Sequence, residues 1–200
     1  MSALATAGHR VTAFARNPEK LPVSESITVV RGDVMDPVAA AAAIAGQDLA
    51  IVSLGNSQNP FATLLGAPRT TPADVCEAGT RHIVAGMRSG GVRRLLVVSA
   101  FGVGDTRDRL PWTFKLFYRA LLREHMADKE KQEVIVKQSG LDWTIVQPVG
   151  LTDEPATGTW LANDKGIIRK QQMSRADVAA FLVSIAEDTR YYRATVALSG

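Results

Sequence analysis

The sequence lacks the cysteines, metal-ligand spacings and long apolar segments that define several classes of protein. Its 200 residues include one cysteine, Cys76, which excludes a disulfide framework and a cysteine zinc cluster within one chain. His9 and His82 lack acidic partners at ligand spacing, so we expect no metal site. No apolar run approaches the ~20 residues of a membrane helix, and the N-terminus lacks the pattern of a signal peptide. We therefore expect a cytoplasmic protein in a reducing compartment.

Charge of one sign is not in large excess either. Lysine and arginine number 23 against 20 aspartate and glutamate, and the basic residues are scattered along the chain. This distribution argues against a nucleic-acid or membrane surface as the partner. Apolar residues make up 46% of the sequence, enough for one globular domain spanning residues 1–200.

Short β-branched runs alternate with longer segments of helical period, which predicts parallel strands joined by crossover helices. The fold class is therefore α/β, a doubly wound, mostly parallel, Rossmann-like sheet. Strands are predicted at Val11–Ala15, Ile27–Val30, Leu49–Ser53, Arg94–Ser99, Trp143–Gln147 and Ala194–Leu198.

Helices are predicted from capping signals and apolar periodicity. They begin at Asp36-Pro37 and at Thr71-Pro72, the latter ending near Ser89, and further helices cover Pro111–His125, Ala127–Gln138 and the segment after Ser174. The segments 60–69 and 152–166 fit neither pattern, and loops of that length in a compact domain are often functional.

Several blocks together resemble the atypical short-chain dehydrogenase/reductases that bind NAD(P)H, the NmrA-like group and relatives of biliverdin reductase B. These blocks are VTAFARNPEKL (11–21), GDVMD (32–36), VVSAFGVGD (97–105), SGLDWTIVQP (139–148) and SRADVAAFL (174–182). Their order and spacing carry the resemblance, since no block is specific alone. The resemblance implies a Rossmann-like fold, an NAD(P)H cofactor and an oxidoreductase activity on a small molecule.

The family's first strand and glycine-rich turn have no counterpart in this sequence. No Gly-x-x-Gly-x-x-Gly or Gly-x-Gly-x-x-Gly occurs, and only about two turns of the following helix fit before Gly8-His9. We hypothesise an N-terminally shortened chain. The absent strand would lie between the strands at Val11 and Leu49, so these would pair directly or keep unpaired edges.

The resemblance assigns the adenosine side of the cofactor to the ends of the first two strands. Arg16 and Asn17 follow the strand that faces the ribose, and arginine there suits a 2′-phosphate, which favours NADP(H) over NAD(H). Asp33 and Val34 match the adenine contact. The structural alternatives are an exposed arginine in a turn and a turn aspartate.

The ends of the next two strands are assigned to the rest of the site. Ser53, Leu54 and Gly55 are expected to pass close to the cofactor, with a plain turn as the alternative. Ser99 matches the serine that holds the substrate carbonyl, and its alternative is a hydroxyl bonded to local backbone.

The superfamily's Tyr-x-x-x-Lys pair is absent, but counting back from Ser139-Gly140 places His125 and Lys129 at its two positions. Histidine donates protons near neutral pH, so we predict His125 as a proton donor and Lys129 as a catalytic residue and ribose ligand, with Ser99 as the third catalytic residue. The alternative is a solvated helix surface.

The leading hypothesis is hydride transfer from NADPH to a small carbonyl, quinone or flavin-like acceptor. The substrate pocket is expected at 101–112, the loop after Pro148 and segment 60–69. Two alternatives stay open: a non-catalytic NADP(H)-sensing or interaction module, and a shortened chain that binds no dinucleotide. The sequence indicates neither the acceptor nor an oligomeric state.

Overall fold

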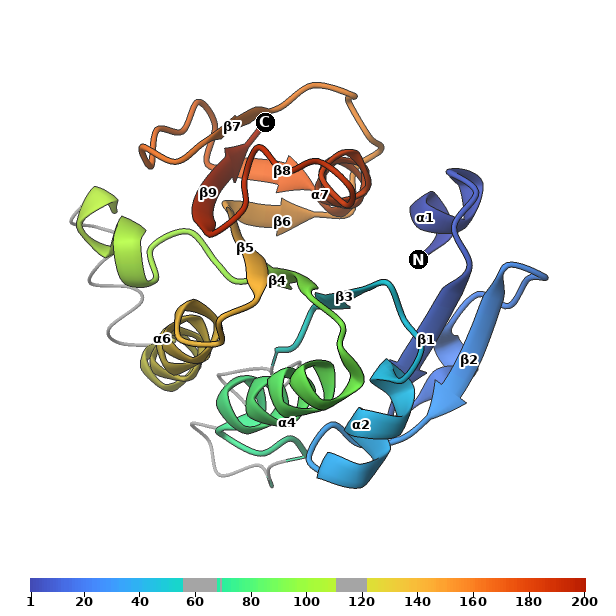
Figure 1. Ribbon diagram of the computed structural model, residues 1–200. Coiled ribbons are helices and arrows are strands. Elements are labelled where there is room, and N and C mark those ends of the chain that lie inside the picture. Colours follow the sequence, from blue (N-terminus) through green and yellow to red (C-terminus); the bar gives the residue numbers. More distant parts are fainter. Residues whose placement is uncertain (56–67, 69, 111–121) are drawn as a thin grey trace.

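The computed structural model describes residues 1–55, 68, 70–110 and 122–200 (Figure 1). Strands carry the architecture: β1 (Val11–Ala15), β2 (Ile27–Arg31), β3 (Leu49–Val52), β4 (Arg94–Val98), β5 (Asp142–Pro148), β6 (Gly150–Thr152), β7 (Leu161–Asn163), β8 (Gln172–Ser174) and β9 (Ala194–Ser199). A five-stranded sheet has the order β3-β4-β5-β9-β7, in which only the β7–β9 pair is antiparallel. The α/β, mostly parallel, Rossmann-like fold class is thus confirmed.

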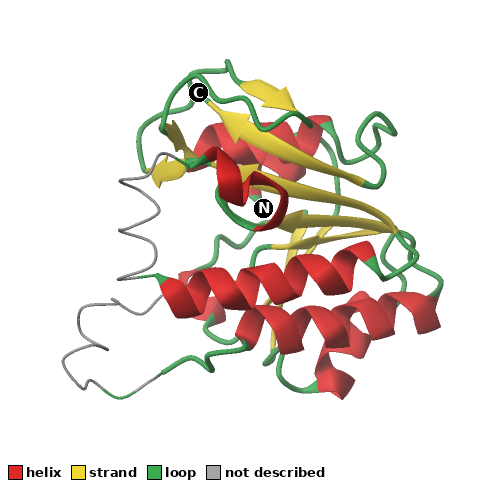
Figure 2. Cartoon of the chain, turned by 90° about the vertical axis from the view of Figure 1, so that its left-hand side faces the viewer, coloured by secondary structure: helices red, strands yellow, loops and turns green. Residues whose placement is uncertain are grey.

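Helices connect the strands and cover both faces of this sheet. They are α1 (Ser2–Thr6), α2 (Pro37–Ile44), α4 (Val75–Gly90), α6 (Arg123–Lys137) and α7 (Arg175–Ser184), with short 3-10 turns η1 (Pro18–Lys20) and η2 (Gly104–Arg109). Helices α2, α4 and α6 lie side by side on one face, and α7 lies on the other (Figures 1 and 2). No helix of the described ranges is both long and apolar enough to cross a membrane.

The two faces hold separate apolar cores, because successive side chains of a strand point to opposite sides. On β4, Leu95 and Val97 pack with α4 and α6, while Leu96 packs with α7. All three side chains are fully buried. Continuous apolar strands of this kind are typical of a parallel sheet covered on both sides.

Strands β1 and β2 form a parallel sheet of their own. The amide of Val11 and the carbonyl of Ala15 both bond to the β2 side, through Ser26 and Gly32. Within the described residues, β1 pairs with β2 and has no ladder with β3. Of the two arrangements expected for the strands at Val11 and Leu49, the structure shows the second, in which they do not pair directly.

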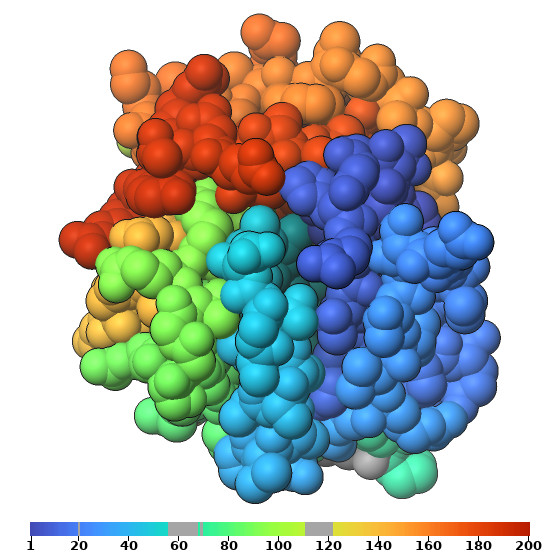
Figure 3. All heavy atoms as spheres, turned by 45° about the vertical axis from the view of Figure 1, so that its right-hand side comes forward, coloured from blue at the N-terminus to red at the C-terminus, as the bar shows by residue number. Residues whose placement is uncertain are grey.

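The N-terminal helix is short, and α1 contacts α7. The space-filling view shows these N-terminal residues, in dark blue, against the red C-terminal segment (Figure 3). α1 therefore lies on the α7 side of the fold, opposite the layer of α2, α4 and α6.

Most predicted strands are observed within a residue or two of their expected bounds, but some helix boundaries were wrong. Helix α4 begins at Val75, later than the Thr71-Pro72 signal, and α6 runs from Arg123 without the break expected near Met126. Residues 111–121 of the helix predicted at Pro111–His125 lie outside the described residues. The predicted cap at Ser174 is confirmed, since its hydroxyl accepts from the amide of Asp177 at 2.9 Å. The segment 152–166 contains β7, and most of segment 60–69 lies outside the described residues.

Candidate functional site

The carboxyl ends of the parallel strands define the candidate site. Strands β3, β4 and β5 run in the same direction, so their following loops meet at one edge of the sheet, where open α/β sheets bind ligands. Ser53, Leu54 and Gly55 follow β3, and Ser99 follows β4. α6 packs over this edge and supplies Lys129.

Lys129 joins the ends of two strands. Its ammonium donates to the carbonyl oxygens of Leu54 and Val98, each at 3.2 Å. Burial lowers the pKa of Lys129 from its ordinary value, against the opposing effect of nearby acidic groups. The structure therefore brings together Lys129, Leu54 and the residue that precedes Ser99.

Ser99 bonds to a residue that sequence reasoning missed. Its hydroxyl is 2.5 Å from Oε1 of Glu133, which lies one helical turn after Lys129 on α6. The exposed fractions are 5% for Ser99 and 1% for Glu133. Burial raises the pKa of Glu133, although hydrogen bonds from Ser99 and Gln147 oppose the shift.

Gln147 orients the same carboxyl from β5. Its Nε2 donates to Oε1 of Glu133 at 2.8 Å and to the carbonyl of Val103 at 2.9 Å, while its own Oε1 accepts from Thr106 at 2.8 Å. All side chains in this network are buried. The sequence did contain a signal, because a glutamine within the apolar run TIVQP needs buried hydrogen-bond partners.

Arg16 follows β1 and reaches a loop on a different part of the chain. Its guanidinium donates to the carbonyl of Thr70 at 3.3 Å and to the hydroxyl of Thr71 at 3.0 Å. A guanidinium has five N–H donors, so others remain for an anion. Asn17 is exposed beside it. Arg31 ends the neighbouring strand and forms an ion pair with Glu19.

Asp33 and Val34 follow β2 and take local roles. The Asp33 carboxylate accepts from the amide of Met35 at 2.9 Å, an Asx-type turn. Val34 is buried in the core near α4, where a Cβ on Gly79 would come within 2.9 Å of both Val34 and Leu54. Glycine at position 79 therefore lets α4 approach the ends of β2 and β3. The adenine contact of Asp33 and Val34 stays a prediction.

Gly55 is open, since nothing lies within 4 Å of the position that a Cβ would take. Ser53 is exposed next to it. This stretch leaves space for a ligand to approach the backbone at the end of β3. Further along, the parts of the predicted pocket at residues 60–67, 69, 111 and 112 lie outside the described residues.

His125 and Lys129 both lie on α6, one turn apart. His125 is partly exposed, whereas Lys129 is directed to the ends of β3 and β4. No described hydrogen bond joins His125 to Ser99. The role of His125 as proton donor therefore stays a prediction, and the contacts of Glu133 single it out as the titratable partner of Ser99.

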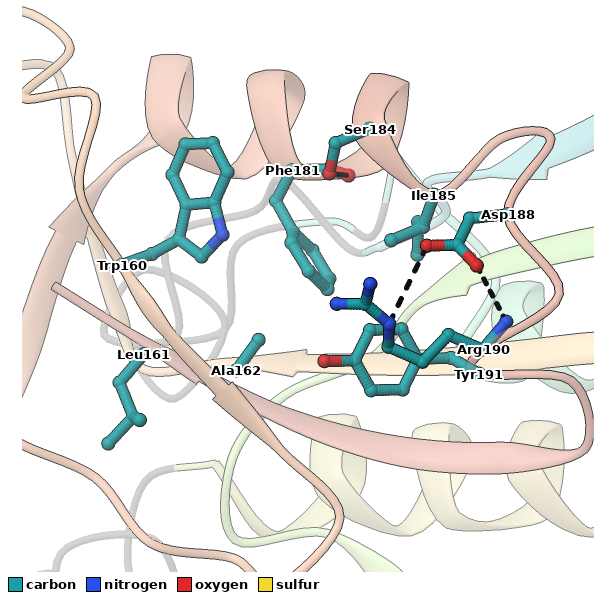
Figure 4. A pocket seen from close by; sticks show the side chains of 9 residues that line it. All are labelled: Trp160, Leu161, Ala162, Phe181, Ser184, Ile185, Asp188, Arg190 and Tyr191. Atoms are coloured by element: carbon teal, nitrogen blue, oxygen red, sulfur yellow. Dashed lines mark hydrogen bonds and ion pairs between the residues drawn. The ribbon is translucent and has the colours of Figure 1, made fainter.

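A hollow of about 440 Å³ lies away from the strand ends, between β7, α7 and the loop before β9. Its walls come from Trp160, Leu161, Ala162, Phe181, Ser184, Ile185, Asp188, Arg190 and Tyr191 (Figure 4). The rings of Trp160 and Phe181 meet edge to face, and Asp188 and Arg190 pair at 3.8 Å. None of the predicted catalytic or cofactor-binding residues lines this hollow, but Trp160, Leu161 and Ala162 belong to the segment after Pro148, where part of the substrate pocket is expected.

The fold and the strand-end site together define a Rossmann-like nucleotide-binding α/β protein. A family model described as NAD(P)H-binding matches residues 1–189, so the chain belongs to this NAD(P)H-binding family. The family resemblance is confirmed at this level, and NAD(P)H binding is the property by which the family is described. The N-terminal shortening stays a prediction.

Two curated relatives are similar to this chain over most of its length. An uncharacterized chloroplastic protein of Arabidopsis thaliana is 28% identical over 189 residues, which cover 90% of this chain and 64% of that protein. A Bacillus subtilis protein named as an uncharacterized sugar epimerase, YhfK, is 28% identical over 180 residues, covering 86% of this chain and 76% of that protein. The chain thus spans less than two thirds of the length of the Arabidopsis relative.

The structure of a short-chain dehydrogenase/reductase from Veillonella parvula in complex with NADP has a TM-score of 0.80 to this chain. The two are 18% identical, and the match covers 100% of this chain and 87% of that one. At this identity the likeness establishes the fold.

Proposed function

We propose that this protein reduces a small carbonyl, quinone or flavin-like acceptor with NADPH. The observation that carries the proposal is the position of Lys129 at the ends of β3 and β4, next to Ser99. In an open α/β sheet this edge receives the nicotinamide, which supplies the hydride. The chain's own residues would bind and orient the two reactants.

The residues at the strand ends fit the two ends of the cofactor. The unused donors of Arg16 and the exposed Asn17 suit a ribose 2′-phosphate, and the open backbone at Gly55 allows close approach. Lys129 would hold the nicotinamide ribose, and Ser99 would hold the acceptor oxygen. Asp33 and Val34 would contact the adenine.

Arg16 provides the test of cofactor choice. We expect Arg16→Asp to weaken NADPH binding on the order of 10-fold or more while leaving NADH binding little changed, because a carboxylate repels the 2′-phosphate. Titration by fluorescence measures both. A matched control is Arg10→Asp, which changes the charge at the other end of β1. An unchanged preference for NADPH would remove Arg16 from the site.

A non-catalytic NADP(H)-sensing module is the second candidate. It is supported by the absence of Tyr-x-x-x-Lys and by the engagement of both Lys129 and Ser99 with partners inside the chain. NADPH consumption with a panel of quinones, flavins, aldehydes and a nucleotide sugar separates the candidates. Turnover with any acceptor supports the enzyme, whereas tight NADPH binding without turnover supports the sensor.

The third candidate, a form that binds no dinucleotide, is supported by the lack of a β1–β3 ladder in the part of the chain that the structure describes. The pyrophosphate in this fold is held by a glycine-rich turn after a central strand. Fluorescence titration of this chain, beside a form extended at its N-terminus by a strand and such a turn, tests it. NADPH binding by the 200-residue chain would refute this candidate.

A further inference from the structure

Glu133 is an unusual carboxyl, because its two oxygens have different surroundings. Oε1 accepts from Ser99 at 2.5 Å and from Gln147 at 2.8 Å. Oε2 is buried without a hydrogen-bond partner in the described structure. A Cβ at position 104 would collide with Oε2, so only glycine there leaves room for this oxygen beside the turn.

This asymmetry favours the protonated carboxyl. An ionised carboxylate spreads its charge over both oxygens, and a buried charged oxygen without a donor is costly. Protonation removes that cost. Among the charged groups nearby, Lys129 and Lys137 on α6 favour the ionised form, while Asp105 on η2, paired with Lys137 at 2.7 Å, favours the neutral form. Burial is the larger effect, and the pKa of Glu133 stays above its ordinary value.

The protonation state of Glu133 decides what Ser99 offers to a ligand. An ionised Glu133 takes the Ser99 hydrogen, so that Ser99 can only accept a hydrogen bond from a ligand. A protonated Glu133 can donate to Ser99, which frees the Ser99 hydrogen for an external oxygen. Reduction of a carbonyl needs this second arrangement, because the oxygen gains negative charge.

We propose that Glu133 is the positioning residue that holds a proton for Ser99 and supplies it, through the Ser99 hydroxyl, to the acceptor oxygen. This inference rests on the proposed reductase function and adds the source of the proton. As hydride reaches the carbonyl carbon, the oxygen forms a bond to the Ser99 proton. The Ser99 oxygen takes the Glu133 proton in the same movement. The products are an alcohol, the oxidised cofactor NADP⁺, an intact serine and a carboxylate, which regains its proton from water.

The first test needs no cofactor or acceptor. Infrared difference spectra between wild type and Glu133→Gln, recorded between about pH 5 and pH 9, isolate the Glu133 carboxyl. We expect a protonated band near neutral pH. In Ser99→Ala, the pH at which the band of the protonated Glu133 carboxyl disappears should rise by about one unit, because the ionised form loses a hydrogen bond. Glu130→Gln, on the same helix and paired with Arg107, is the matched control and should leave the band unchanged.

The second test is kinetic. With an acceptor that wild type reduces, kcat should fall as the pH rises through the pKa of Glu133. Glu133→Gln keeps the shape of the side chain but has no proton to give, so kcat should drop on the order of 100-fold and lose this pH dependence, with NADPH affinity unchanged. Glu133→Asp should restore part of the pH dependence.

The two tests distinguish a failure of the proposed function from a failure of the inference about Glu133. If no acceptor is reduced by wild type, the proposed function fails, and the infrared titration alone judges the proton held at Glu133. If Glu133 titrates in the ordinary acid range, or if Ser99→Ala does not shift it, the inference is overturned even in an active enzyme. An unchanged kinetic pH profile in Glu133→Gln would also overturn it.

Discussion

Asp128 on α6 caps helix α4 by accepting a hydrogen bond from the backbone amide of Cys76 at 2.9 Å. Its other oxygen accepts from the amide of Glu77 at 2.8 Å. The first amides of a helix have no partner inside the helix, and Asp74 at the N-cap makes no side-chain bond to them. A carboxylate from another helix therefore does the capping, and it joins α4 to the helix that carries Lys129.

We expect Asp128→Ala to lower the free energy of unfolding by about 2 kcal/mol, because one buried and one partly buried amide lose their acceptor. Urea denaturation measures this change. Asp74→Ala is the matched control and should change stability by less than about 0.5 kcal/mol. Equal effects of the two substitutions would show that Asp128 is not the cap.

Arg94 at the start of β4 is 6% exposed and ties the end of α7 to the sheet. Its guanidinium donates to the carbonyls of Ile185 and Asp142 at 2.8 and 3.0 Å and to the hydroxyl of Thr144 at 2.8 Å. Lysine cannot reproduce this fork of donors, so we expect Arg94→Lys to destabilise the protein by about 3 kcal/mol.

Arg93→Lys is the control for Arg94. The Arg93 side chain is 64% exposed and pairs with Asp142 at 3.1 Å, a surface contact worth at most about 1 kcal/mol. Thermal or urea unfolding of the two variants measures the difference. A loss that is the same for both would contradict the role given to the buried guanidinium.

Lys129 stabilises the ends of β3 and β4 whatever its role toward a cofactor. Methionine keeps its length but leaves the carbonyls of Leu54 and Val98 without this donor. We expect Lys129→Met to reduce stability by about 2 kcal/mol. Lys131→Met, which removes only a surface pair with Glu77, should leave stability almost unchanged in the same denaturation experiment. Equal losses would place Lys129 among ordinary surface lysines.

Sequence pattern predicted the strands well, because apolar β-branched runs bounded by turn residues carry their own signal. β1 is observed at the predicted Val11–Ala15. Helix starts were less predictable where the cap is distant in sequence. The cap of α4 is Asp128, which lies 52 residues after the Cys76 amide that it accepts from, so the local signal at Thr71 misled the prediction.

In the candidate site, too, the contacts between residues distant in sequence were the ones that could not be predicted. Lys129 and Ser99 followed from resemblance and spacing, and the structure brings Lys129 to the residue before Ser99. Glu133 was missed because a glutamate in the run DKEKQE has the pattern of a solvated helix face. Only the packing of α6 against β4 and β5 buries it, and that contact joins residues distant in the chain.

Asp177 predicts a pH dependence of stability with a definite sign. It is buried at the start of α7 and accepts from the amides of Thr157 and Gly158, each at 2.9 Å, and from the Ser174 hydroxyl. Burial acts to raise the pKa of Asp177, but these hydrogen bonds to the ionised form outweigh it and lower the pKa below the ordinary value. The carboxylate thereby ties the loop at 157–158 to α7.

A group whose pKa is lower in the folded protein stabilises it fully above the pKa of the unfolded chain, about 3.9 for aspartate, and loses this effect as the pH falls through the folded value. We therefore expect wild type to exceed Asp177→Asn in stability at about pH 5 to 7, and the gap to close toward about pH 2. Urea denaturation across this range measures the gap. Asp153→Asn, at an 89% exposed side chain paired with Arg175, should show almost no gap at any pH. A gap of constant size for Asp177→Asn would mean that shape, rather than ionisation, makes this side chain hold the loop.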